Sequence, residues 1–304
     1  MNVVSLLFPD FLLIVCGYLL CRYTALNRSV WEPVERLVYF VLFPVLLFTS
    51  IVRTPLEWQT ATHMMGAGLT LGIMGIALAY SLPRWPWVGQ RLEPRLYAAS
   101  AQVAFRFNSF IVLALVDRIV GPQGLPLVAI LIGVCVPLFN VGAVFPMARH
   151  GSHGLWRELS RNPLIIATLA GLLCNVSGFS VPTWLDPAAQ RVGQASLALG
   201  LMAAGAGMQL GRMADAKTLA TLVLGIKHLV LPLAALGVAM LWQLNPSQSL
   251  VLLLFSAVPT ASSCYVLAAR MGYDGAYVAG LVTLSTVLGA VSLAFTLGVL
   301  LPLR

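Results

Sequence analysis

The sequence predicts an all-α membrane protein with ten transmembrane helices, arranged as two five-helix repeats of opposite orientation. Three observations lead to this fold class. Apolar residues make up 59% of the 304 positions and charged residues only 9%, with a mean hydropathy of +0.90. The apolar residues form long runs, and basic residues gather in alternate connections between these runs. Since soluble globular domains carry about 25% charged residues, the composition excludes a soluble protein.

The apolar runs are long enough to cross a membrane as helices. A helix rises about 1.5 Å per residue, so about 20 apolar residues span a hydrocarbon core of about 30 Å. Such runs predict helices over 3–21, 34–52, 63–82, 96–117, 125–148, 163–180, 188–210, 218–242, 249–269 and 275–301. Little chain is left over, so we expect neither a soluble catalytic domain nor a signalling domain.

The basic residues predict the orientation of the helices. Twelve lie in alternate connections: Arg22, Arg28, Arg36, Arg84, Arg91, Arg95, Arg149, Arg157, Arg161, Arg212, Lys217 and Arg270. The other side has four: Arg53, Arg118, Arg191 and Arg304. By the positive-inside rule the richer side is cytoplasmic, and both termini lie outside the cytoplasm. The net charge of +8 therefore indicates a lipid bilayer as the partner, and no nucleic acid is expected.

A fixed offset relates the two halves of the chain. Shifting the sequence by 153 residues aligns a few identical positions: Leu19-Leu20-Cys21 with Leu172-Leu173-Cys174, Trp31 with Trp184, and Ser109 with Ser262. We therefore predict two repeats, 1–152 and 153–304. Because each repeat has five helices, the second enters the membrane from the opposite face. Inverted repeats of this kind are typical of secondary transporters.

The polar residues of the predicted fourth and ninth helices lie at mid-membrane depth. Asn108, in "AFRFNSF" (104–110), lies about twelve residues, or about 18 Å, into its helix. Pro259, in "AVPTASSCYVLAAR" (257–270), lies about ten residues, or about 15 Å, into its own. Proline lacks an N–H and interrupts a helix, and Thr260, Ser262 and Ser263 can supply replacement hydrogen bonds. Unwound backbone at this depth is tolerated only where it is buried inside the protein or lines a cavity. We therefore expect both interruptions to face a binding site.

Two basic residues at this depth indicate an anionic ligand. Arg106 is deep, and a buried guanidinium costs about 2.5 kcal/mol or more. Lys227 lies about nine residues, or about 13 Å, into the eighth helix. Each also has a purely structural interpretation, because arginine can hydrogen-bond helix carbonyls and lysine can extend to the membrane surface. Likewise, Asn108, Ser109 and the residues after Pro259 can simply join neighbouring helices.

Three stretches resemble the auxin efflux carrier family of transporters, whose bacterial members include permeases assigned to malonate and other carboxylates. They are "FRFNSF" (105–110), "PTASSCYVLAARMGYDGAYVAGLVTLSTVLG" (259–289) and "IKHLVLPL" (226–233). The resemblance implies a fold like that of bile-acid sodium symporters, with broken fourth and ninth helices crossing at the substrate site. It also implies that Asn108 contacts substrate.

The same resemblance implies a division into two moving parts. Helices one, two, six and seven would form a scaffold that often dimerises, and the other six a transport domain that moves as an elevator. One stretch departs from the family: a glycine- and proline-containing run commonly follows the asparagine, whereas this chain has "FIVLALV" (110–116). We therefore expect a shallower first interruption. The seventh helix carries small residues, which predict tight helix packing or a homodimer seam: Gly200, Ala203, Ala204, Gly207 and Gly211.

These observations predict a secondary-active transporter of a small organic, carboxylate-type anion in the bacterial inner membrane. The predicted substrate-binding residues are Arg106, Asn108, Ser109, Lys227, Pro259, Thr260, Ser262 and Ser263. A cation- or proton-coupled symporter of another small solute is the alternative. A membrane-embedded enzyme is disfavoured because the sequence has neither HExxH nor GxSxG. No metal or other cofactor is expected, because the five cysteines lie in apolar runs without metal-ligand spacing.

Overall fold

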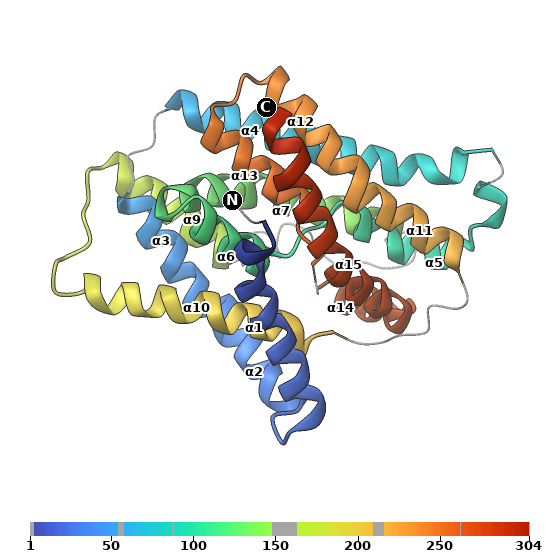
Figure 1. Ribbon diagram of the computed structural model, residues 1–304, viewed down its shortest axis with the longest axis horizontal. Coiled ribbons are helices and arrows are strands. Elements are labelled where there is room, and N and C mark those ends of the chain that lie inside the picture. The colour runs from blue at the N-terminus through green and yellow to red at the C-terminus, as the bar shows by residue number, and fades with distance from the viewer. Residues whose placement is uncertain are drawn as a thin grey trace. The chain divides into compact units, whose positions relative to one another are not determined.

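The computed structural model describes residues 3–53, 58–86, 88–147, 163–208, 216–261 and 263–303, and every regular element in these ranges is helical (Figure 1). Each of the ten predicted ranges overlaps at least one helix. Within the described chain, six helical segments are long and apolar enough to cross a membrane: Arg28–Arg53, Thr60–Arg84, Pro94–Ile119, Pro122–Met147, Lys217–Leu241 and Gly275–Leu303. The all-helical membrane class is confirmed, and ten crossings stay a prediction.

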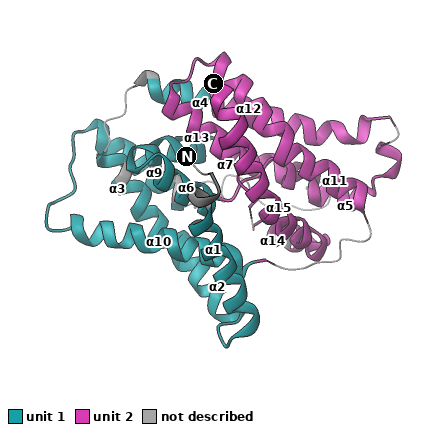
Figure 2. Cartoon of the chain, viewed as in Figure 1, with its two compact units in different colours: residues 1–66, 109–134, 154–207 teal, residues 67–108, 135–153, 208–304 magenta. Residues whose placement is uncertain are grey.

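The chain divides into two compact units, which Figure 2 colours separately. Unit 1 contains residues 1–66, 109–134 and 154–207, and unit 2 contains residues 67–108, 135–153 and 208–304. Each unit takes segments from both predicted repeats. The compact units therefore differ from the repeats 1–152 and 153–304, whose relationship remains a prediction from the sequence.

Unit 1 is built around one central helix, α10 (Asp186–Ala206), which packs against most of the others. Its partners are α1 (Val3–Tyr23), α2 (Arg28–Leu37), α3 (Phe43–Arg53) and α6 (Ser109–Ile119). A π-helical turn, η1 (Val38–Leu42), joins α2 to α3, and α9 (Pro163–Val176) packs on α3. An ion pair between Arg53 and Asp186 links the end of α3 to the start of α10.

Glycines allow α1 and α10 to approach backbone to backbone. A methyl group on Gly17 would lie 2.7 Å from Cα of Met202, and one on Gly205 would lie 2.7 Å from the carbonyl carbon of Ile14. On the same helix, a methyl group on Gly200 would lie 2.8 Å from the ring of Phe43. Tight packing of this helix is therefore present within unit 1, and the homodimer seam stays a prediction.

Replacing Gly205 with alanine is expected to destabilise the protein by about 1–3 kcal/mol, because α1 must move away from the added methyl group. The apparent melting temperature in detergent should fall by about 2–12 °C. Gly237→Ala is the matched control, since no atom lies within 4 Å of a methyl group there. Equal melting temperatures for the two variants would show that the close approach of α1 and α10 is not needed.

Unit 2 contains the remaining helices. It takes the later part of α4 (Trp58–Ser81) and of α7 (Leu125–Met147). Its other members are η2 (Leu82–Arg84), η3 (Gly89–Arg91), α5 (Pro94–Ser100), η4 (Ala101–Ala104), α11 (Lys217–Gly225), η7 (Ile226–Val230), α12 (Leu231–Leu241), α13 (Pro246–Ala257), α14 (Ser263–Arg270), α15 (Gly275–Phe295), η8 (Thr296–Leu300) and η9 (Leu301–Leu303). Within this unit α14 packs against α15, and α12 packs against α13 (Figure 1).

Polar caps set the starts of three helices in unit 2. The carboxylate of Glu93 accepts hydrogen bonds from the backbone N–H groups of Arg95 and Leu96 at the start of α5. A capping box of Asn245 and Gln248 begins α13, and Asp274 caps α15. These side chains satisfy N–H groups that a helix leaves unpaired. They therefore fix where each helix begins and hence the positions of the polar residues farther along it.

Candidate functional site

Two interruptions of helical structure carry most of the predicted site. The first interruption, residues 105–108, lies between η4 and α6 and contains Arg106 and Asn108. The second interruption, whose described residues are 258–261, lies between α13 and α14 and contains Pro259 and Thr260. The chain thus leaves helical geometry at both places where we expected it to do so.

The two interruptions contact each other directly. The backbone N–H of Asn108 donates a hydrogen bond of 2.8 Å to the carbonyl oxygen of Pro259. Asn108 is 5% exposed and Thr260 is fully buried. Residues 151 positions apart in the sequence are therefore joined by backbone atoms, in a bond that does not depend on the asparagine side chain.

The expected replacement hydrogen bonds are different from those observed. We expected the side chains after Pro259 to pair the freed backbone groups. Instead, the Pro259 carbonyl is paired by Asn108, and the N–H of Thr260 donates to Oγ of Ser285 on α15 at 2.9 Å. The Thr260 hydroxyl lies 3.5 Å from Sγ of Cys264. Neighbouring elements therefore pair these two backbone groups, and the pairing of the carbonyl that Pro259 frees in the preceding turn stays a prediction; Ser262 lies outside the described residues.

Close packing holds the second interruption in place. A methyl group on Gly289 of α15 would lie 2.5 Å from Cγ of Pro259, so the proline ring rests directly on that glycine. The ring of Phe107, in the first interruption, lies 4.2 Å from that of Phe255 on α13. Apolar contacts therefore cover part of the backbone of both interruptions: Gly289 of α15 on the second, and Phe255 of α13 on the first.

Arg106 is half-buried and is held by two neutral amides. Its Nη1 donates to Oε1 of Gln102 at 3.0 Å, and its Nη2 donates to Oδ1 of Asn140 on α7 at 3.2 Å. Nε2 of Gln102 in turn donates to the carbonyl of Cys264, in the first turn of α14, at 3.1 Å. Gln102 therefore ties the guanidinium to the helix that follows the second interruption.

Lys227 is buried beside the same interruption. It is 1% exposed, and Nζ donates to the carbonyl of Ser256, in the last turn of α13, at 3.1 Å. The interpretation that its side chain extends to the membrane surface is therefore wrong. Lys227 lies in η7, a π-helical turn, and such turns within α-helices are frequent at functional sites.

Lys227 and the second interruption are also linked through the next residue along the chain. Nε2 of His228 lies 2.8 Å from Oγ of Ser285, the same hydroxyl that accepts from the N–H of Thr260. The hydroxyl of Ser292 donates to the carbonyl of His228 at 3.0 Å. These contacts attach η7 to α15 and place both beside Thr260.

Neither basic residue has an acidic partner among the described residues. The salt bridges there join Arg28 to Glu32 and Glu35, and Arg53 to Asp186. Arg106 and Lys227 are instead held by amide and carbonyl oxygens. A buried charge without a counter-charge is costly, so this arrangement favours an anionic ligand. Among the described residues, no group of three or more His, Cys, Asp or Glu side chains could hold a metal ion.

The remaining predicted residues lie at helix starts. Ser109 is the first residue of α6, which belongs to unit 1, and Ser263 is the exposed first residue of α14 in unit 2. Three residues of the site were missed in the sequence: Gln102, Asn140 and Ser285. Each is a neutral polar residue in an apolar run, and the position of Gln102 four residues before Arg106 was the one signal that could have identified it.

An all-helical chain with several membrane-length helices and buried polar breaks is a multi-pass membrane protein. The family model described as a membrane transport protein matches residues 94–297, which include every predicted site residue. The chain belongs to this family, the auxin efflux carriers, and is a transporter.

Bacterial relatives agree with this assignment. A protein of Escherichia coli strain K12, described as the uncharacterized transporter YfdV, is 24% identical over 279 residues, covering 87% of each chain. Proteins of the same description from Escherichia coli O157:H7 and Shigella flexneri have the same identity and coverage.

Proposed function

We propose that this transporter carries a small organic anion of the carboxylate type, bound where the two interruptions meet. One observation carries the proposal. Arg106 lies in the first interruption and Lys227 lies beside the second, and both are held by neutral oxygens. Neither forms a salt bridge with any described residue. A carboxylate supplies the missing negative charge. A cationic substrate would meet two like charges in a medium of low dielectric.

Each residue has a distinct role in this proposal. Arg106 and Lys227 attract the carboxylate, and the side-chain amide of Asn108 hydrogen-bonds it. In this proposal Ser262 and Ser263 hydrogen-bond the carboxylate, which the positive end of the α14 dipole also favours. Thr260 and Pro259 shape the second interruption. Ser109 has the corresponding role at the start of α6, directly after the first interruption.

We propose that transport occurs by an elevator movement across the membrane of the six predicted helices outside the scaffold, most of whose residues lie in unit 2. Every hydrogen bond described above for Arg106, Asn108, Thr260 and Lys227 is made within unit 2, so these four residues can travel together, whereas Ser109 belongs to unit 1. The predicted scaffold helices, the first, second, sixth and most of the seventh, lie in unit 1, which also holds residues 109–134 of the fourth and fifth. The proposal also includes ten membrane crossings in two inverted repeats. Both termini lie outside the cytoplasm of a bacterial cell, and two copies of the chain form a homodimer.

Replacing Asn108 with alanine tests the proposed site. The backbone bond to Pro259 is retained, so the melting temperature should change little, whereas the apparent affinity for a transported carboxylate should fall about tenfold with the loss of the amide. Carboxylate counterflow in proteoliposomes measures this effect, and saturation with counterflow distinguishes a carrier from a channel.

Asn175→Ala is the control, because Asn175 donates to the carbonyl of Ile51 within unit 1 and is not one of the proposed site residues. It should keep the wild-type affinity. Should Asn108→Ala transport every tested carboxylate with unchanged apparent affinity, the assignment of the site is wrong.

A further inference from the structure

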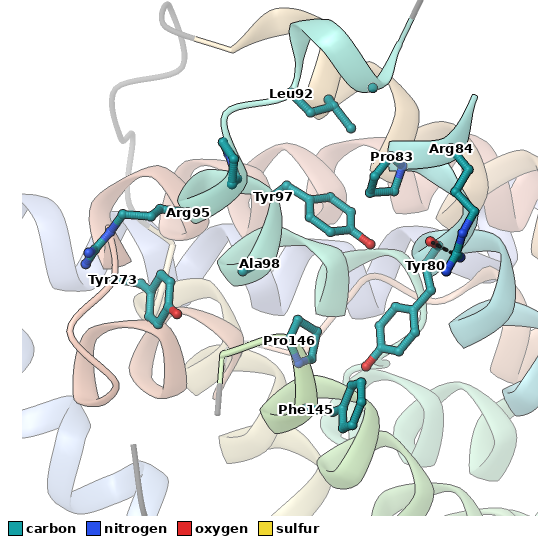
Figure 3. Close-up of a pocket in the computed structure, with 12 residues that line it drawn as sticks. Tyr80, Pro83, Arg84, Leu92, Arg95, Tyr97, Ala98, Phe145, Pro146 and Tyr273 are labelled. Carbon is teal, nitrogen blue, oxygen red and sulfur yellow. Dashed lines mark hydrogen bonds between the residues drawn. The ribbon is translucent and has the colours of Figure 1, made fainter. Parts of the chain in front are cut away.

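Unit 2 contains a cavity, of about 620 Å³, that the proposed transport site does not use. Figure 3 shows its walls: Tyr80 from α4, Tyr97 and Ala98 from α5, Phe145 and Pro146 from α7, and Tyr273 from the turn before α15. None of Arg106, Asn108, Pro259, Thr260 and Lys227 lines it. Its volume is within the range of small-molecule sites, about 300–1,000 Å³.

The cavity lies at the ends of membrane-length helices. Its lining includes Arg84 at the end of the segment Thr60–Arg84 and Pro94 at the start of Pro94–Ile119. Pro146 comes next to last in the segment Pro122–Met147. The ends of transmembrane helices lie at the depth of lipid headgroups, so this cavity opens where a membrane places its phosphate groups.

Two exposed arginines flank the cavity, and each uses only one guanidinium nitrogen in the hydrogen bonds described. Arg84 uses Nη1 for the carbonyl of Tyr80 at 3.5 Å, and Arg95 uses Nη2 for the carbonyl of Gly272 at 3.0 Å. The Arg95 guanidinium also stacks over the ring of Tyr273 at 5.2 Å (Figure 3). A guanidinium has five N–H donors, and neither arginine takes part in a salt bridge among the described residues.

The acidic residues next to the lining in sequence are committed to helix caps. Both carboxylate oxygens of Glu93 accept from backbone N–H groups at the start of α5. Oδ1 of Asp274 accepts from the N–H of Tyr277 at the start of α15. Neither carboxylate forms a salt bridge with Arg84 or Arg95 among the described residues, so the N–H donors of both arginines stay available to an anionic ligand.

The floor of the cavity is aromatic and is fixed by hydrogen bonds to backbone carbonyls. The hydroxyls of Tyr97 and Tyr273 donate to the carbonyls of Ala79 at 3.1 Å and Met147 at 3.3 Å. The hydroxyl of Tyr80 donates to the carbonyl of Gly142. With these hydroxyls engaged, the rings present apolar surface. Phe145, which stacks on Tyr80, is 65% exposed and extends this apolar surface out of the cavity.

The chain between α4 and α5 forms a wall that is held by its own backbone. The N–H of Trp85 donates to the carbonyl of Leu82 at 3.2 Å, and that of Gly89 donates to the carbonyl of Trp85 at 3.1 Å. Gly89 packs so closely on Pro83 that a methyl group there would overlap the carbonyl of that proline. The wall is thus preformed, so a ligand need not order it on binding.

We propose that this cavity binds the headgroup of an anionic phospholipid, with the guanidinium of Arg84 on the phosphate and an acyl chain against Phe145, while Arg95 adds positive charge at the opposite end of the cavity (Figure 3). Arginine recognises phosphate through paired N–H donors, and basic pockets between transmembrane helices bind acidic headgroups. The aromatic floor and the exposed phenylalanine favour a lipid over a free inorganic anion, which would use the arginines alone.

Native mass spectrometry of the full-length purified protein tests the proposal. Phosphatidylglycerol and phosphatidylcholine with the same acyl chains are titrated separately. The wild type should retain phosphatidylglycerol about tenfold more strongly. The double variant Arg84→Gln/Arg95→Gln should lose this preference. The control Arg22→Gln/Arg36→Gln, which removes two exposed arginines of unit 1, should keep it.

A second variant keeps the test decisive if the double variant folds poorly. Ala98→Phe fills the cavity and leaves both arginines in place, and it should also lose the preference for phosphatidylglycerol. Retention of that preference by either variant, or its absence in the wild type, overturns the proposal. Displacement of phosphatidylglycerol by millimolar inorganic phosphate would overturn the choice of a lipid as the ligand.

Discussion

Replacing Asn140 with aspartate is expected to keep the protein folded and to weaken carboxylate binding about a hundredfold. Oδ1 of Asn140 accepts a hydrogen bond of 3.2 Å from Nη2 of Arg106. Aspartate has the same shape and keeps that acceptor, but it adds a negative charge beside the guanidinium. Two unit charges about 4 Å apart interact by about 4 kcal/mol at an effective dielectric constant of 20. The positive charge of Arg106 would then be compensated by the aspartate before a substrate binds.

The control for this prediction is Asn140→Leu, which removes the acceptor without adding a charge. Its loss of affinity should be much smaller than that of the aspartate variant, because Arg106 stays positive and still donates to Gln102. Affinities come from the concentration dependence of carboxylate counterflow, and the melting temperature reports folding. Equal losses for the two variants would mean that the hydrogen bond, and not the charge on Arg106, is what matters.

Replacing Lys227 with methionine is expected to reduce carboxylate transport at least about a hundredfold while leaving the protein stable. Methionine has a similar length and fills the space of a side chain that is 1% exposed. The change removes a buried charge, which is often neutral or stabilising, although the carbonyl of Ser256 loses its donor. Transport should fall because one of the two charges that attract the substrate is gone.

Lys217→Met is the matched control, since Lys217 is exposed at the first residue of α11. It should transport carboxylates like the wild type. If Lys227→Met does so as well, and only its melting temperature falls, Lys227 has a structural role in holding the end of α13 and does not attract substrate.

The positions of the interruptions could be predicted from the sequence because their cause is local. Pro259 lacks an N–H, and Arg106 and Asn108 are polar residues in the middle of an apolar run. The repeat offset placed Asn108 opposite Ala261, two residues from the proline whose carbonyl it binds. An offset of identical residues indicates which segments correspond, but it cannot specify a hydrogen bond, which depends on how two segments cross.

The partners of the basic residues could not be predicted, because tertiary packing determines them. Asn140 resembles an ordinary helix-packing residue in the sequence, and only the packing of α7 brings it to Arg106, whereas Gln102 in η4 is a local partner four residues before the arginine. Whether Lys227 is buried depends on the end of α13, which lies 29 residues farther along the chain. The two units depend in the same way on contacts between distant segments, so runs of apolar residues do not reveal them.

The central claim is that an organic anion completes the charge of Arg106 and Lys227 where the two interruptions meet. The most direct measurement is the melting temperature of the purified protein with a series of carboxylates, each paired with its uncharged amide, because a ligand of the folded state raises stability. We predict that at least one carboxylate stabilises the wild type, that its amide does not, and that Asn140→Asp abolishes the effect. Stabilisation by neutral or cationic solutes alone, unchanged in Asn140→Asp, would contradict the claim.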